Sequence, residues 1–143
     1  MAVRGLVAAA LLATCLAAAA QDTGARNAAP ACPTRAETTH LHLIGLWRAE
    51  FQGLWQGATL LLEPHRELRE SVSGAINRDG VRAQVAGDVD EGEFSLEEST
   101  DGVSISATWI GDVVEGSCGR EIRGSWQATS ERVARPFVLR KLP

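Results

Sequence analysis

The strongest constraint on the fold is an alternation of apolar and polar residues that recurs over short runs. Val81, Ala83 and Val85, for example, alternate with Arg82 and Gln84. A period of two is typical of β-strands that bury one face. About eight such runs follow one another, at residues 43–51, 58–63, 68–76, 81–88, 93–98, 103–109, 122–128 and 136–142. The pattern predicts an all-β domain.

Turn residues separate these runs. Residues 77–80 read Asn-Arg-Asp-Gly and residues 99–102 read Ser-Thr-Asp-Gly, combinations that favour tight turns. Glycines within the runs, such as Gly74, Gly87 and Gly124, permit the strong coiling that a small closed barrel needs. Short strands joined by tight turns predict a single antiparallel up-and-down barrel, with a β-sandwich as the alternative.

The N-terminus has the features of a cleaved secretory signal at residues 1–20. Arg4 precedes an apolar run that is shorter than the roughly 20 residues of a membrane span, so we expect no membrane span. Small alanines up to Ala20 offer a cleavage site. The alternative is a lipid anchor at Cys15, because the preceding Leu-Ala-Thr resembles a bacterial lipobox. We expect an extended segment at residues 21–40 and the barrel at residues 41–143.

The amino-acid composition limits the cellular compartments and the classes of partner that fit this chain. The formal net charge is −4 and no basic face is evident, which argues against nucleic-acid binding. Thirteen of the 14 basic residues are arginine, and alanine is abundant, as in proteins from GC-rich bacterial genomes. We therefore predict a periplasmic or secreted bacterial protein.

The cysteines fit an oxidising compartment. Removal of the signal would leave Cys32 and Cys118, and two cysteines in an exported chain pair more often than they bind metal. We predict a disulfide between them. A redox-active dithiol is the alternative, but the Cys-x-x-Cys spacing is missing.

Two features resemble the calycin barrels, the group that contains lipocalins, avidins and bacterial metalloprotease inhibitors. Gly45-Leu46-Trp47 matches the start of their first strand, and Arg140 lies in the last predicted strand. The resemblance covers the layout of residues 43–142. It implies that Arg140 packs over Trp47 and closes one end of the barrel, with a cation–π contact. In the bacterial inhibitors of this group, a segment before the barrel enters the protease cleft.

The other tryptophans suggest two kinds of contact. Trp109 and Trp126 fall on predicted inward faces and could line a pocket for an apolar ligand, or simply fill the core. Trp55 lies between Gly53 and Gly57 in a predicted turn, so it is our candidate for a partner contact.

We find no residues that indicate catalysis or a cofactor. Phosphate-loop, dinucleotide-binding and hydrolase motifs are missing from the sequence. His40 and His42 have a chelating spacing but no carboxylate partner, so we predict no metal site. The acidic stretch at residues 88–101 is interpreted as a solvated hairpin tip.

These observations predict a monomeric, non-enzymatic, exported binding protein. Its partner would be an unknown protein or a small apolar ligand. The alternatives are a periplasmic or secreted protease inhibitor and a carrier of a small apolar ligand.

Overall fold

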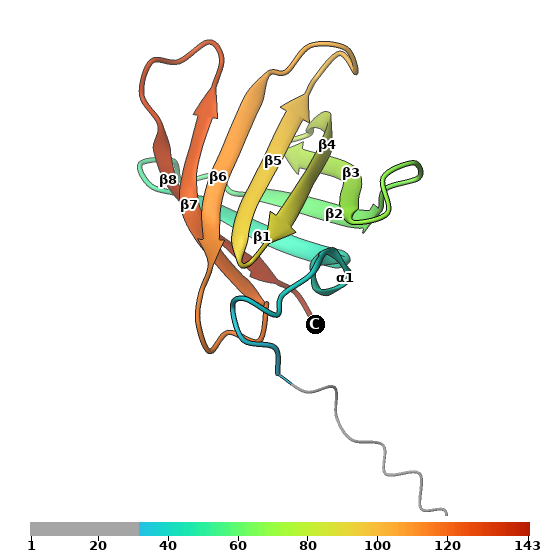
Figure 1. Cartoon of the computed structure of the whole chain (residues 1–143). Helices are drawn as coiled ribbons and strands as arrows, with labels where there is room; N and C mark the ends of the chain where they lie inside the picture. Colours follow the sequence, from blue (N-terminus) through green and yellow to red (C-terminus); the bar gives the residue numbers. More distant parts are fainter. Residues whose placement is uncertain (1–31) are drawn as a thin grey trace, which may run out of the picture.

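The computed structural model describes residues 32–143, in which eight antiparallel strands form a closed barrel (Figure 1). Each strand pairs with its neighbour in sequence, and the last pairs with the first, so the prediction of a single up-and-down barrel is confirmed. The strands are β1 Gly45–Phe51, β2 Ala58–Pro64, β3 Ser71–Arg78, β4 Val81–Asp90, β5 Glu93–Ser99, β6 Ala107–Val113, β7 Glu121–Ala128 and β8 Arg135–Lys141. The predicted signal at residues 1–20 and Cys15 lie outside the described residues.

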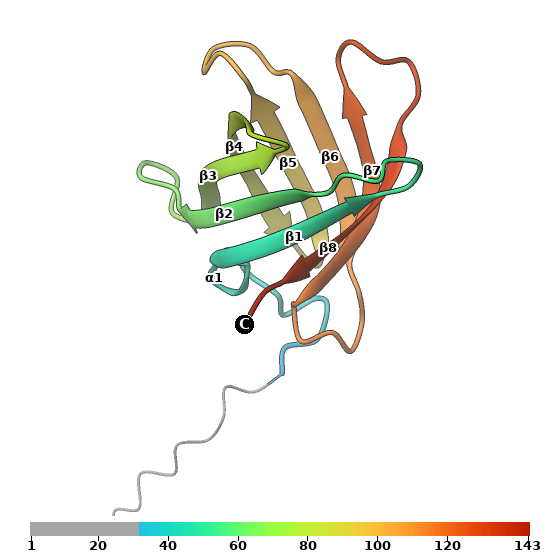
Figure 2. The same ribbon diagram turned by 180° about the vertical axis from the view of Figure 1, so that it is seen from behind.

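The connections between strands alternate between two ends of the barrel. One end, called the loop end below, holds the β1–β2, β3–β4, β5–β6 and β7–β8 connections. The opposite, closed end holds the short helix α1 (His40–Leu43) and the C-terminal end of β8, as Figures 1 and 2 show. Within residues 32–143, no helix has the length and apolar character needed to cross a membrane.

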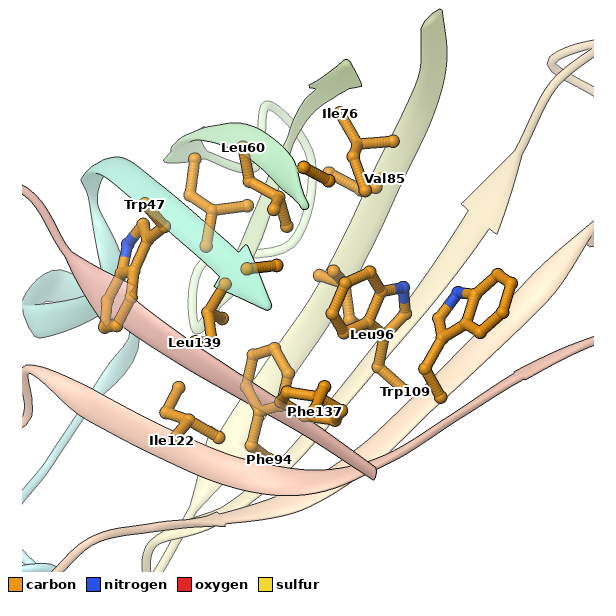
Figure 3. Close-up of a cluster of buried hydrophobic side chains, with 14 of the residues drawn as sticks. Trp47, Leu60, Ile76, Val85, Phe94, Leu96, Trp109, Ile122, Phe137 and Leu139 are labelled. Atoms are coloured by element: carbon orange, nitrogen blue, oxygen red, sulfur yellow. The ribbon is translucent and has the colours of Figure 1, made fainter. Parts of the chain in front are cut away.

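Inward-facing side chains fill the barrel. Large residues from every strand are almost completely buried, among them Trp47, Phe94 and Trp109. Figure 3 shows these side chains converging from opposite walls of the barrel. The alternation seen in the sequence therefore reports which side chains form this core.

Glycines allow the strands to coil closely around that core. A Cβ atom added to Gly74 would lie 1.9 Å from the carbonyl oxygen of Leu61, and one added to Gly124 would lie 2.0 Å from that of Ile110. Gly111 pairs directly with Gly124 across β6 and β7. No larger residue fits these positions without movement of the backbone.

The β5–β6 connection departs from our prediction, which had a strand at residues 103–109. β6 begins only at Ala107, and Val103 and Ile105, expected to face inward, are exposed. The side chain of Asp101 explains the difference. Its Oδ1 accepts hydrogen bonds from the backbone N–H groups of Val103 and Ser104, at 2.8 and 2.7 Å, which holds this segment in a loop.

The start of β3 is also later than predicted. Residues 68–70 were expected to begin a strand, but they belong to the β2–β3 connection. His65 Nδ1 accepts hydrogen bonds from the backbone N–H groups of Glu67 and Leu68, at 3.2 and 3.1 Å. These local bonds hold the chain in a turn before β3 begins at Ser71.

Candidate functional site

The closed end of the barrel is built around Trp47. This side chain is fully buried, and its Nε1–H donates a hydrogen bond to the carbonyl oxygen of Leu43 at 2.7 Å. The ammonium of Lys141 lies 5.8 Å from the centre of the Trp47 ring and donates to the carbonyl oxygen of His42 at 2.6 Å. Burial, followed by the nearby positive charge of Arg120, lowers the pKa of Lys141.

The prediction that Arg140 packs over Trp47 is therefore wrong by one residue. The register pairs Trp47 with Lys141, whereas Arg140 is opposite Arg48 and points to the outside of the barrel. There the Arg140 guanidinium forms ion pairs with Glu50, at 3.1 Å, and with Glu121, at 3.3 Å. The cation next to the Trp47 ring at the closed end is therefore Lys141.

This difference predicts unequal effects of two neighbouring substitutions. Lys141→Ala should destabilise the protein by about 1.5–3 kcal/mol, because it removes a charged hydrogen bond that caps α1. Arg140→Ala should cost less than about 1 kcal/mol, because its ion pairs are exposed. Urea denaturation of both variants measures the difference, and equal losses would contradict the assignment of Lys141 as the closing residue.

The predicted pairing of Cys32 with Cys118 is confirmed. Their Cα atoms lie 4.6 Å apart across a sequence separation of 86 residues. The disulfide fixes the start of the described chain to the β6–β7 connection at the closed end. Arg35, just after Cys32, also forms an ion pair with Asp112 of β6.

Trp109 and Trp126, our candidates for a ligand pocket, are packed core residues. Both are buried, and they contact Phe51 with ring-centre distances of 5.2 and 5.3 Å. Trp109 also lies 4.9 Å from Phe137. These rings fill the half of the barrel nearest the loop end.

A buried carboxylate joins this aromatic cluster, and the sequence reasoning missed it. Glu98 is only 4% exposed, and its Oε2 accepts hydrogen bonds from the indole N–H groups of Trp109 and Trp126, at 3.3 and 3.2 Å. We had counted Glu98 as part of a solvated acidic stretch. A signal was present, because Phe94, Leu96 and Glu98 share the inward face of β5.

Arg78 completes the polar cluster at the loop end. Its guanidinium bonds to both carboxylate oxygens of Glu98, at 3.4 and 3.2 Å. It also lies 4.7 Å from the ring centre of Trp126 and 5.2 Å from that of Phe51. Because three donor groups bind this one carboxylate, Glu98 holds the side chains of Arg78, Trp109 and Trp126 in place at the loop end.

Above this cluster, each of the four loop-end connections carries or borders an exposed large apolar residue. Trp55 is 92% exposed, Val103 90%, Val133 71% and Val81 63%. We call these four residues the apolar rim. The four lie on different connections, so the rim depends on the barrel fold and not on one segment of sequence. Trp55 is the partner-contact candidate identified from the sequence.

Hydrogen bonds hold these loops to one another and to the barrel. Ser106 of the β5–β6 loop accepts, through its carbonyl oxygen, from the backbone N–H and the hydroxyl of Thr129, at 2.9 and 3.0 Å. The bonds from the backbone N–H groups of Ser104 and Val103 lower the pKa of Asp101 to about 2, so this carboxylate keeps its charge well into the acidic range. The two loops that carry Val103 and Val133 are therefore tied to each other.

The fold and this site define a small closed antiparallel barrel with a filled interior and an apolar loop end. No protein-family model and no curated protein matches the chain.

Proposed function

We propose that this chain is a non-enzymatic, exported binding protein that contacts a partner protein through the apolar rim. The observation that carries the proposal is the exposure of one large apolar residue at each of the four loop-end connections. Exposing such residues to water is unfavourable, and all four lie at the same end of the barrel, where one partner would bury them. Tryptophan is also enriched among the residues that dominate binding energy.

The charges around the rim favour a protein over an anionic membrane. Exposed Arg82 and Arg132 lie at the loop end of the barrel, as do exposed Asp79 and Asp101. This mixture of signs lacks the excess of positive charge that anionic lipid attracts. Arginine and tryptophan are instead both enriched in protein interfaces.

The filled interior weighs against the alternative of a small apolar ligand carrier. Trp109, Trp126 and Phe51 occupy the space that such a ligand would need. A protease inhibitor remains compatible with the proposal, with a secreted hydrolase as the partner. The predicted signal and the Cys32–Cys118 disulfide support export to the periplasm or medium.

The geometry at the closed end supports the proposal of a calycin-type barrel. Trp47 of the Gly-x-Trp motif lies in β1 directly after α1, and a cation from β8 lies near its ring. Lys141 in place of the expected arginine is the departure from that pattern.

The experiment that tests the function is capture of partners from periplasmic extract or culture fluid with the tagged mature protein. Trp55→Ala should weaken binding of the captured partner by at least about tenfold, because loss of a central aromatic contact costs about 2 kcal/mol or more. Leu41→Ala is the matched control, since Leu41 is exposed at the closed end. The two variants should have the same melting temperature as the parent.

Two results would overturn the proposal. One is a partner whose affinity is unchanged by Trp55→Ala and by Val103→Ser. The other is a partner that Leu41→Ala weakens as much as Trp55→Ala does.

A further inference from the structure

The outer face of the barrel carries three neighbouring hollows, which are lined by residues of β2–β6 and share some of these residues. Their volumes are about 690, 280 and 400 Å³. The first and second share Ala86 and Glu97, and the second and third share Asp88 and Ile110. Together they form one channel, called the outer trough below, that runs from the β5–β6 loop toward the β4–β5 turn.

The trough exists because small residues occupy its floor. Ser73, Ala75 and Ala86 take outward positions on β3 and β4, where longer side chains would cover the sheet. The β5–β6 loop forms one wall by folding over this face. A Cβ atom added to Gly102 of that loop would lie 3.4 Å from the side chain of Gln84 on β4.

The trough is strongly acidic. Seven carboxylates border it. Glu98 is buried and paired with Arg78, and the other six are Glu63, Asp88, Asp90, Glu93, Glu97 and Asp112. Within residues 32–143, Asp112 is the only one of these six in an ion pair, with Arg35. Among the described residues that line the trough, Arg66 contributes the one guanidinium. A cleft lined by one sign of charge concentrates ligands of the opposite sign.

Apolar side chains stand along the same trough. Leu61 and Ile105 border its wider end, and Leu68 and Ile110 border the narrower part. All four are exposed. A complementary ligand therefore carries both positive charge and apolar groups. Because every strand of the closed barrel is already paired on both sides, side chains and not a β-ladder would hold it.

We propose that the outer trough binds an extended basic segment of a partner protein, with lysine or arginine facing the unpaired carboxylates and apolar side chains contacting Leu61 and Ile110. The length of the trough over several strands suits an extended segment. Of the apolar rim, only Val103 borders the trough. The proposal rests instead on the floor and the carboxylates, which belong to the outer face of the barrel.

Fluorescence anisotropy with two labelled decapeptides tests the proposal. One alternates lysine with leucine and the other alternates glutamate with leucine. The lysine peptide should bind and the glutamate peptide should not, and raising the salt concentration should weaken binding. Ala86→Trp, which fills the floor, should weaken binding by at least about tenfold. Ser125→Trp, at an outward position on β7, is the matched control and should leave it unchanged.

A second pair of variants separates a specific site from general attraction to an acidic protein. Glu97→Lys and Glu50→Lys change the net charge equally, but Glu50 lies on β1, outside the trough. Only Glu97→Lys should strongly weaken binding. Equal effects of the two, equal effects of the two tryptophan variants, or no binding of the lysine peptide would overturn the proposal. The Trp55→Ala capture experiment is independent of all three results.

Discussion

Glu98→Ala should destabilise the protein by about 3 kcal/mol or more, because removal of one partner from a buried ion pair leaves the other uncompensated. The carboxylate of Glu98 accepts from Arg78 and from the indoles of Trp109 and Trp126. Without it, two buried indole N–H groups and a mostly buried guanidinium lose their acceptor, and each loss adds a desolvation cost. Urea denaturation followed by tryptophan fluorescence measures the change.

The neighbouring residue provides the control. Glu97→Ala should change stability by less than about 0.5 kcal/mol, because Glu97 is exposed on the outer face of the same strand. The double variant Arg78→Met with Glu98→Leu should recover part of the loss, since apolar replacement of both partners removes the unpaired charge but still leaves the two indole N–H groups without an acceptor. Equal losses for Glu97→Ala and Glu98→Ala would contradict the role assigned to Glu98.

The barrel was predictable because its core follows the strand period. In β4, Ala83 and Val85 are buried and Arg82 and Gln84 are exposed, as the alternation required, whereas Val81 at the start of the strand is 63% exposed. The turn at Asp79 and Gly80 has positive φ at both residues, which matches the turn chemistry of the sequence. Local preference and burial agree at these positions, so the sequence was sufficient.

The cation next to Trp47 was predicted as Arg140 instead of Lys141 because we followed the resemblance to calycin barrels and not the alternation of inward and outward residues in the last strand. Phe137 and Leu139 face inward in β8, so the next inward position is Lys141 and not Arg140. The alternation therefore contained the correct answer. The resemblance to calycin barrels indicated a cation over Trp47 but could not specify the register of the last strand.

Side-chain hydrogen bonds caused the other misses. Val103 and Ile105 continue a strand-like alternation, but Asp101 binds the backbone N–H groups that a ladder would use. Glu98 was assigned to the surface because it is charged, although it occupies an inward position. Its burial depends on Arg78, Trp109 and Trp126, which come from three other strands and cannot be matched to it from sequence alone.

Replacement of both Cys32 and Cys118 by serine should destabilise the protein by about 4 kcal/mol, since the chain-entropy model assigns a large effect to a disulfide that closes a long loop. The closed segment spans 86 residues and includes most of the barrel. The unfolded state of the oxidised chain is therefore strongly restricted, and the variant removes that restriction. Urea denaturation of the oxidised parent and the double variant measures the difference.

Arg35→Ala distinguishes the disulfide from the other contact that holds the same segment. The Arg35–Asp112 ion pair is about half exposed, so its loss should cost less than about 1 kcal/mol. A similarly small loss in the double serine variant would mean that contacts of residues 32–39 with the barrel, rather than the covalent bond, stabilise the closed end. A large loss in the serine variant alone would place that stability in the disulfide, and hence tie the fold to an oxidising compartment.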